Sequence, residues 1–565
     1  MEPAQTLRFA FEPITSVVPE NYSWLSYVVL GFVLFNLIEF GLQSLVYLPI
    51  FFHFIRQKEG NIIFKLGITT LFIVVRLTTV YLILLLVPPK LIWDLDFGHA
   101  IHPRPFLFIV CFGAIGVFFI FTLTMCFSCF KLLVTGTIRP TRKLCNNKED
   151  KVEAADNLLP TVIVLMPVYN EEPAALIRAV DSIIASDYPS IKQHFFISFD
   201  DARESELFQS LIKHLANQAG SEGSLGKSGT EFVVNGVRVT VNRFEHAGKR
   251  ETQAKSFDII NQLYEKDESA RILLLDSDIV LHPNAIYNLV TRNKAVGTTG
   301  LITCRTSEDS SLLNCLQDAD YVNEQLFIRS TEVLLGGAMC LPGTMTMTDM
   351  KTLRKVAPMY FQKVDPRKTI DYHRLQLGED RYLTFLLLQE GKKDGGVGFQ
   401  ADSHCKTEGQ PTFTSLLKQR RRWFLGTLSN DIALLLSLEI WRRVPFVLIF
   451  KFFSYGMAGV SLLTWAVCSA YTMTTGNPNN ELTFSHLFFY IAIGMFSIKF
   501  AINTAVAIQI HRRKVMVFAI LFALINSLFM AVVVVYSVWT WNVRSWGGPR
   551  TDSKETTKPL SAVKV

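Results

Sequence analysis

The chain has 565 residues, of which 49% are hydrophobic, and 44 of them are phenylalanine. Its mean hydropathy of +0.27 is too apolar for an ordinary soluble enzyme of this length. The net charge of +7 is spread along the chain without a basic tract that interleaves aromatic residues, so nucleic-acid binding is not indicated. The nine cysteines show no paired framework, which is typical of a reduced, cytosolic environment.

Six apolar runs are long enough to cross a bilayer, at residues 26–52, 62–87, 105–129, 444–471, 482–508 and 515–539. Lysine and arginine near their ends predict an outer N-terminus and a cytosolic globular domain in a multi-pass protein, most simply of the plasma membrane. We expect a membrane block over 1–138, a linker over 139–158, a globular domain over 159–430, an interfacial helix over 431–443, a second membrane block over 444–550 and a flexible tail over 551–565.

Three charged side chains fall inside these runs: Glu39, Arg76 and Lys451. Charges at membrane depth face a cavity or one another. A channel for a polymer is one such cavity, and a structural ion pair is the other interpretation. The sequence does not choose between them.

The globular segment alternates short apolar runs with helical stretches. Runs that end in turn residues predict strands at 161–170, 194–200, 237–245, 271–278 and 295–304. Helices are expected from Pro173, over 204–217 and over 250–266. This alternation predicts an α/β domain with a doubly wound, mostly parallel sheet, in which ligands bind at the carboxyl ends of the strands. Asp200, Asp276 and Asp278 fall there.

Three motifs point to chemistry, and each has a simpler interpretation. Asp276 and Asp278 follow a strand and could hold Mg²⁺ or Mn²⁺ against a diphosphate, or form a surface turn. The pair Glu379-Asp380 supplies either a general base or a helix cap. The stretch QRRRW, 419–423, is either a pyrophosphate clamp with an apolar plate for a sugar, or a basic anchor at the membrane surface.

Taken in order, MPVYNE, GKRETQ, DSD, CLPG, GED and QRRRW resemble the processive membrane glycosyltransferases of family 2, which are the cellulose, hyaluronan and chitin synthases. CLPG (340–343), LGEDRYLT (377–384) and CKT (405–407) favour a chitin synthase. The resemblance covers about residues 160–430. It implies a glycosyltransferase-A-type (Rossmann-like) cytosolic domain inserted between two blocks of transmembrane helices.

The resemblance also implies roles for individual residues. It implies that uridine is bound by Tyr169, Glu171 and Asp200. It implies that the diphosphate is bound by Lys249, Arg250, Gln419, Arg420 and Arg422. The acceptor sugar would contact Trp423, and the substrate would contact Cys340, Leu341, Pro342 and Gly343. Asp276 and Asp278 would hold Mg²⁺ or Mn²⁺. Asp380 would be the base, with Glu379 beside it. Asp200-Asp201 departs from the usual Asp-Gly, which puts the nucleotide contact in question.

The implied activity is inverting transfer of GlcNAc from UDP-GlcNAc to the 4-hydroxyl of a growing chain, which leaves through the protein's own channel. The partners would be the UDP-sugar, the polysaccharide acceptor and the lipid bilayer, and an oligomer is possible. A hyaluronan-type or other polysaccharide synthase shares the same core. A transporter with a regulatory cytosolic domain, or a non-processive lipid-linked glycosyltransferase, would leave QRRRW unexplained.

A last motif conflicts with the count of spans. RSWGGPR, 544–550, resembles an element that the family keeps on the cytosolic side, whereas six spans place these residues outside. Either the sixth run breaks near 522–531 into a re-entrant hairpin, or the count is wrong.

Overall fold

The computed structural model describes residues 23–85, 105–135, 137–138, 158–226, 228–292, 295–307, 310–391, 396–456 and 484–544. The chain divides into two compact units, one of Met1–Leu133 with Asp431–Trp541 and the other of Val134–Asn430 with Asn542–Val565. The SWGGPR element at 545–550, the tail after it and residues 139–157 of the expected linker lie outside the described residues.

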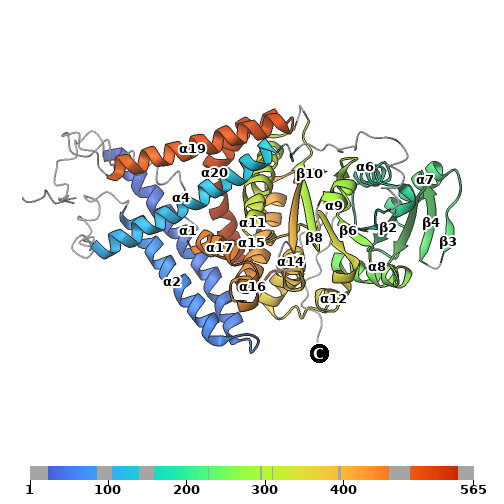
Figure 1. Ribbon diagram of the computed structural model, residues 1–565, viewed down its shortest axis with the longest axis horizontal. Helices are drawn as coiled ribbons and strands as arrows, with labels where there is room; N and C mark the ends of the chain where they lie inside the picture. Colours follow the sequence, from blue (N-terminus) through green and yellow to red (C-terminus); the bar gives the residue numbers. More distant parts are fainter. Residues whose placement is uncertain are drawn as a thin grey trace, which may run out of the picture. The chain divides into compact units, whose positions relative to one another are not determined.

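Long apolar helices make up the first unit (Figure 1). They are α1 (Ser23–Arg56), α2 (Ile62–Leu85), α4 (Pro105–Val134), α17 (Pro445–Gly456), α19 (Phe484–Gln509) and α20 (Arg513–Trp539). Within the described residues, Leu34–Arg56 and Ile62–Val80 are apolar and long enough to cross a membrane. The two parts of α20 add a third crossing if they are counted together. The larger number of spans expected from the sequence stays a prediction.

The helix α20 bends by 58° between its halves, Lys514–Ala523 and Ile525–Trp539. The bend falls inside the stretch 522–531, where the sequence suggested a break. A bend of this size fits a broken span or a re-entrant loop, so the expected hairpin stays a prediction. Asn526 and Ser527 both remain helical and do not interrupt α20.

The charges at membrane depth have polar partners inside the first unit. Arg76 on α2 donates to the backbone carbonyl of Tyr455 on α17 at 3.2 Å. Lys451 Nζ lies 3.7 Å from Asp431 Oδ2. Glu39 accepts a hydrogen bond of 3.0 Å from the glutamine one turn further along α1. The contacts of Arg76 and Lys451 join different helices and favour a structural role for these charges, whereas the contact of Glu39 lies within α1.

The second unit is built on one sheet of ten strands. They are β1 (Val162–Val168), β2 (Gln193–Phe199), β3 (Ser224–Gly226), β4 (Gly229–Val234), β5 (Val237–Arg243), β6 (Arg271–Leu275), β7 (Val280–Leu281), β8 (Gly297–Cys304), β9 (Met345–Asp349) and β10 (Val397–Thr407). Their order is β3-β4-β5-β2-β1-β6-β9-β8-β10-β7. All five predicted strands are confirmed.

The sheet is mixed, which corrects the expectation of a mostly parallel one. Strands β5, β2, β1 and β6 are parallel, as the alternation of strands and helices predicted. Strand β9, however, enters between β6 and β8 and runs antiparallel to both. Its short sequence MTMTD follows a loop, and neither its place nor its direction is encoded in a local pattern. The β3–β4 hairpin adds further antiparallel pairs at one edge.

Helices cover both faces of this sheet, with α6 and α7 on one side of its parallel part and α8 and α12 on the other (Figure 1). The helices of this unit are α6 (Pro173–Ile184), α7 (Glu206–Ala219), α8 (Lys249–Leu263), α9 (Ala285–Arg292), α10 (Leu312–Asn323), α11 (Ser330–Leu334), α12 (Met350–Tyr360), α13 (Thr369–Tyr372), α14 (Glu379–Glu390) and α15 (Phe413–Leu435). Two π-helical turns, η4 (Glu324–Arg329) and η5 (His373–Leu377), adjoin α11 and α14. The core lies between α6, α7, α9 and the sheet, where Met166, Ile197 and Leu273 are fully buried. The α/β expectation is confirmed.

The expected interfacial helix, 431–443, is not one element. Residues 431–435 are the last part of α15, and a separate short helix, α16 (Leu438–Arg443), follows a break. Ser437 causes the restart because its Oγ caps α16 by accepting from the amide of Ile440 at 3.5 Å.

Candidate active site

The carboxyl ends of β2, β1 and β6 meet at one edge of the sheet because these strands run parallel. Asp200, Tyr169 and Asp276 follow the three strands, and the sequence predicted this edge for Asp200 and Asp276. The turn after β6 is tied to the turn after β1, since Ser277 Oγ donates to Glu171 Oε2 at 3.0 Å.

Asp200 shapes the turn that leads into α8. Its carboxylate accepts from the amides of Ala247 at 2.9 Å and Gly248 at 3.0 Å. His246 Nδ1 lies 2.9 Å from Asp200 Oδ2, and the His246 ring stacks on Tyr169 with 4.4 Å between centroids. Both oxygens of Asp200 are thus engaged within the protein, and its contact with a nucleoside stays a prediction. The sequence analysis did not single out His246, although it lies two residues before the GKRETQ stretch.

Lys249 joins the two acidic motifs. Its Nζ lies 2.5 Å from Asp276 Oδ1 and 3.8 Å from Glu379 Oε1. Burial alone would lower the pKa of Lys249, but these carboxylates raise it above its ordinary value. Burial alone would raise the pKa of Asp276, but the Lys249 ammonium and then Arg422 hold it below its ordinary value. For Glu379 burial prevails and the pKa is raised.

Arg250 has a different place from the one expected. Its guanidinium donates to the backbone carbonyls of Leu375, at 2.6 Å, and of Gln362. The side chain is 7% exposed. Arg250 therefore fastens η5, the turn before Glu379, to α8, and its contact with a diphosphate stays a prediction.

Asp278 is held by the end of β10. Its Oδ2 accepts from Thr407 Oγ1 at 2.9 Å and from the Glu408 amide at 3.1 Å. Thr407 ends the CKT stretch, so this contact gives that motif a structural role. Asp276 and Asp278 thus leave the same strand end and are fixed by different elements.

Glu379 and Asp380 form the first turn of α14. Asp380 Oδ1 accepts from the Arg381 amide at 2.8 Å, and its Oδ2 lies 3.5 Å from Cys340 Sγ. Asp380 and Glu379 line a small cavity together with Lys249, Gly343 and hydrophobic side chains. The structure therefore brings the two carboxylates of GED to the place where DSD and Lys249 meet.

The CLPG stretch forms another wall of this cavity. The Leu341 amide donates to Thr384 Oγ1 at 2.7 Å, and the Pro342 carbonyl accepts from Thr346 Oγ1 at 2.8 Å. A Cβ at position 343 would come within 2.9 Å of the Lys249 ammonium. Gly343 therefore leaves room for the Lys249 ammonium, and a larger side chain would require the end of Lys249 to shift.

Two glycines bring the QRRRW helix α15 against the start of α14. A Cβ at Gly426 would lie 2.7 Å from Gly378 Cα, and a Cβ at Gly378 would lie 2.8 Å from the Gly426 carbonyl oxygen. Asn430 Nδ2 completes the contact by donating to the carbonyls of Gly378 and Gly426, both at 3.0 Å. The close packing of these backbones sets the distance between QRRRW and GED.

The arginines of QRRRW have separate environments. Arg420 Nη1 lies 2.7 Å from Asp320 Oδ2, and its guanidinium lies 4.3 Å above the Trp423 ring. The Trp423 ring also meets the edge of Tyr321, with 6.0 Å between centroids. Gln419 Oε1 is buried without a hydrogen-bond partner among the residues that the structure describes. Arg422 acts on the pKa of both Lys249 and Asp276, which places it near the Lys249 cluster, and the contacts of Arg420 and Arg422 with a diphosphate stay predictions.

Arg421, which the sequence reading left unassigned, is 3% exposed and donates to the Val543 carbonyl at 2.8 Å. The next residue, Arg544, donates to Thr369 Oγ1 at 2.6 Å and accepts from Tyr372 Oη through its carbonyl. The stretch before SWGGPR therefore packs on the second unit. No local pattern in either segment indicates this pairing.

The carboxylates at this site suit a metal ion only when a bound ligand supplies further oxygen atoms. Across the described ranges, no group of three or more histidine, cysteine, aspartate or glutamate side chains could hold an ion alone. Magnesium, however, is commonly bound by one or two carboxylates together with substrate phosphates. Asp276 and Asp278 fit that second arrangement and do not fit a metal cage made by protein alone.

Comparison with known proteins identifies relatives. A family model described as chitin synthase matches residues 253–563. Chitin synthase D of Aspergillus fumigatus is 33% identical over 82% of this chain and 62% of its own length. Chitin synthase VI of Metarhizium acridum is 32% identical over 75% of this chain and 66% of its own length. Chitin synthase 7 of Verticillium dahliae is 33% identical over 77% of this chain and 62% of its own length. The chain thus spans less than two thirds of the length of these relatives.

One solved structure was also compared. A mannosyltransferase from Pyrobaculum calidifontis, in complex with GDP-Man and Mn²⁺, is 12% identical, covers 73% of this chain and 99% of its own, and has a TM-score of 0.36. That likeness is too low to bear on this chain. The family model, in contrast, matches more than half of the chain and includes DSD, CLPG, GED and QRRRW. The chain belongs to the chitin synthase family.

Proposed function

We propose that the protein is a membrane-embedded, processive, inverting glycosyltransferase of glycosyltransferase-A type. It transfers GlcNAc from UDP-GlcNAc to the 4-hydroxyl of a growing β-1,4-linked chitin chain. One observation carries the proposal: Lys249 pairs with the strand-end carboxylate Asp276 and with Glu379, and it lines one cavity together with Glu379 and Asp380. Membership of the chitin synthase family supports the choice of sugar and product.

Asp380 acts as the base in this proposal. Its carboxylate takes the proton of the acceptor hydroxyl while that oxygen attacks the anomeric carbon, and the bond from this carbon to the UDP oxygen breaks. Base catalysis of this kind contributes about 10²–10⁴-fold. The Arg381 amide, 2.8 Å from Oδ1, fixes the orientation of the carboxylate. Glu379 is instead paired with Lys249 and is the less suitable base.

Positive charge around Asp276 stabilises the leaving diphosphate. Lys249 and Arg422 supply it from α8 and α15, in a site partly closed to water. A divalent cation held by Asp276 and Asp278 together with the diphosphate would add further positive charge at the leaving group. Trp423, stacked against Arg420, offers an apolar plate for the acceptor sugar.

The apolar helices of the first unit support an assignment as a membrane protein, for which we propose several passes and the plasma membrane. We place the catalytic unit in the cytosol and the channel for the product in the membrane block. The residues that lead into SWGGPR belong to the catalytic unit, because Val543 bonds to Arg421. This contact supports a cytosolic position for 545–550.

The test of the activity is polymer formation by the purified protein. Radiolabelled UDP-GlcNAc with Mg²⁺ or Mn²⁺ should give a chitinase-sensitive polymer, and a chelator should abolish it. Product only when UDP-glucuronate is also supplied would assign a hyaluronan-type synthase. Absence of polymer with either donor would contradict the proposal.

The role of Asp380 has its own test. Asp380→Asn should lower polymer synthesis by about 10²–10⁴-fold and leave UDP binding unchanged, because the amide cannot take a proton but keeps the shape of the side chain. Radiometric turnover and calorimetric UDP binding measure the two quantities. Substantial residual turnover would remove Asp380 from the mechanism.

A further inference from the structure

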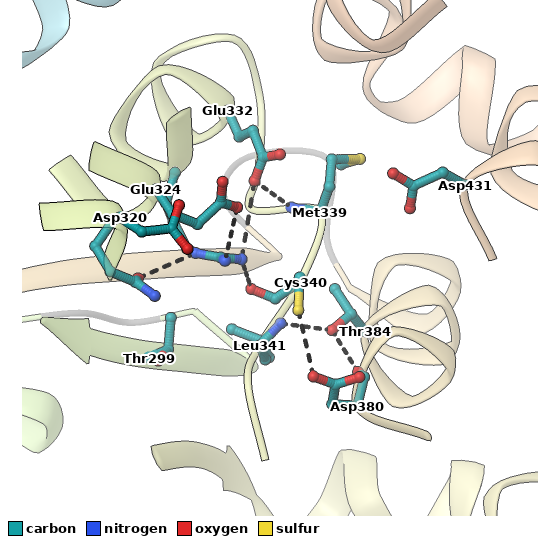
Figure 2. A network of polar contacts seen from close by, with 12 residues as sticks. Thr299, Asp320, Glu324, Glu332, Met339, Cys340, Leu341, Asp380, Thr384 and Asp431 are labelled. Carbon is teal, nitrogen blue, oxygen red and sulfur yellow. Dashed lines mark hydrogen bonds and ion pairs between the residues drawn. The ribbon is translucent and has the colours of Figure 1, made fainter. Parts of the chain in front are cut away.

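Residues 339–341 lie in the loop between α11 and β9. Each of these three residues has a backbone amide or carbonyl that is hydrogen-bonded to a side chain from elsewhere in the fold. Glu332 Oε2 accepts from the Met339 amide at 3.0 Å. Arg329 Nη1 donates to the Cys340 carbonyl. The Leu341 amide donates to Thr384 Oγ1 at 2.7 Å (Figure 2). Such dense side-chain bonding leaves the loop little freedom to move.

The two charged residues of this network are deeply buried. Arg329 is 2% exposed and Glu332 is 1% exposed, and their charged groups lie 4.0 Å apart. Burying an ion pair removes two charges from water, and apolar replacements are often as stable or more so. Stability alone therefore does not account for the pair. Arg329 also closes the π-helical turn η4, a kind of turn frequent at functional sites.

The loop directs one side chain at the proposed base. Cys340 Sγ lies 3.5 Å from Asp380 Oδ2 and can donate its proton to that oxygen (Figure 2). Thr384 ties the loop to the same helix turn, because its Oγ1 also donates to the Asp380 carbonyl at 2.8 Å. Burial, followed by the nearby Asp380 carboxylate, raises the pKa of Cys340 to about 12, so the sulfur keeps its proton.

We propose that Arg329 and Glu332 form a positioning clamp that holds Cys340 against Asp380 and thereby orients the base. The inference rests on the proposed function and extends it to residues outside the motifs. The clamp acts through the backbone of 339–341, and neither charged residue needs to touch substrate. Thr384 links the clamp to α14.

The first test removes the thiol. Cys340→Ala should lower turnover about tenfold while the KM for UDP-GlcNAc stays within about twofold, because the base is displaced and the donor site is not. The acidic limb of the pH profile of turnover should move to higher pH, since the carboxylate loses a donor to its charged form. The other charged and titratable groups around Asp380 come from α8, α12 and α14, and they are Lys249, Tyr360, Glu379 and Arg381.

The second test loosens the clamp. Arg329→Lys should reproduce the loss of turnover and the shifted pH profile, because an ammonium cannot keep the geometry of the guanidinium. Glu332→Gln keeps an oxygen that accepts from Met339 and should lose less turnover than Glu332→Ala. Arg292→Lys is the matched control, because Arg292 pairs with the fully buried Asp402 and has no role in the clamp. The control should leave the pH profile unchanged.

A double-mutant cycle decides whether the clamp acts through Cys340. In the Cys340→Ala background, Arg329→Lys should cause little further loss, whereas independent effects would multiply. Loss of UDP binding in parallel with turnover would also overturn the proposal.

Iodoacetamide labelling gives a readout without activity. Cys340 should be protected in the wild-type protein and labelled faster in Arg329→Lys. Unchanged protection together with unchanged turnover would refute the clamp. If the wild-type protein makes no polymer, the proposed function fails and labelling still tests the clamp. If Arg329→Lys does not fold, the pH profile of Cys340→Ala decides the outcome.

Discussion

The contact between Gly378 and Gly426 makes a sharp prediction about Gly426→Ala. The added Cβ would lie 2.7 Å from Gly378 Cα and N and 2.9 Å from the carbonyl carbon of Leu377. Carbon atoms pack comfortably at about 3.5–4.0 Å, so the two backbones must separate by about 1 Å. All of these neighbours are backbone atoms, which have no rotamer by which to move aside. We therefore expect α15 to shift relative to the first turn of α14.

Stability and activity should respond differently to this shift. Overpacking costs about 1–3 kcal/mol, and alanine in place of glycine inside a helix returns about 1 kcal/mol. The net loss of folding free energy is thus about 0–2 kcal/mol. Asp380 lies two residues after Gly378, and a displacement of about 1 Å at a catalytic group can cost about 10²-fold in rate. Turnover should fall about a hundredfold in a protein that remains folded.

The assay compares radiolabelled polymer formation with thermal unfolding in the same preparation. Gly494→Ala is the matched control, because Gly494 lies within the helix α19 and a Cβ there meets nothing within 4 Å. The control should retain wild-type turnover. Turnover near wild type in Gly426→Ala would refute the reasoning, since it would show that the helices separate without moving Asp380.

Three further predictions follow from the same contacts. Trp423→Ala should reduce acceptor-dependent elongation more than hydrolysis of UDP-GlcNAc, measured side by side; equal losses would exclude a stacking role. Lys249→Met should lower the melting temperature more at about pH 7 than at about pH 4, because the variant lacks the ammonium that lowers the pKa of Asp276 and burial then raises that pKa, so the carboxyl is a buried anion without its counter-ion at neutral pH and takes up a proton in acid; a loss independent of pH would contradict this. Arg421→Ala should expose the chain near Arg544 to limited proteolysis, while unchanged cleavage would show that the Val543 contact is dispensable.

The sequence predicted those parts of the site that depend on strand order alone. Asp276 and Asp200 could be placed because a buried apolar run ends just before each of them, and parallel strands bring such ends together. Strand β9 could not be placed because five residues carry too little pattern to specify a direction. Its antiparallel entry follows from the path of the loop that holds CLPG, which is a tertiary feature.

Buried charge is a second feature that the sequence does not indicate. Charged residues are mostly exposed in proteins, and nothing in EQLFIRSTEV, 324–333, suggests an exception. In the fold, Arg329 and Glu332 are among the least exposed residues, since they bond to a loop rather than to solvent. A single sequence does not indicate that these two charged side chains are buried. Only the position of the loop shows that the charges have partners inside.

The arginines of QRRRW show how a motif can mislead when it is taken as one unit. In a helix, successive side chains point about 100° apart, so three consecutive residues cannot reach the same ligand from one face. Helical geometry thus already argues against binding of one pyrophosphate by all three arginines. The contacts agree: Arg420 lies against Asp320 and Trp423, and Arg421 bonds to Val543. Arg422 acts instead on the pKa of Lys249. One helical turn therefore joins three structures, namely the ring proposed to bind the acceptor sugar, the chain before SWGGPR and the charges proposed to meet the diphosphate. Any shift of α15 would move all three together, which is why the packing of two small glycines matters for the chemistry.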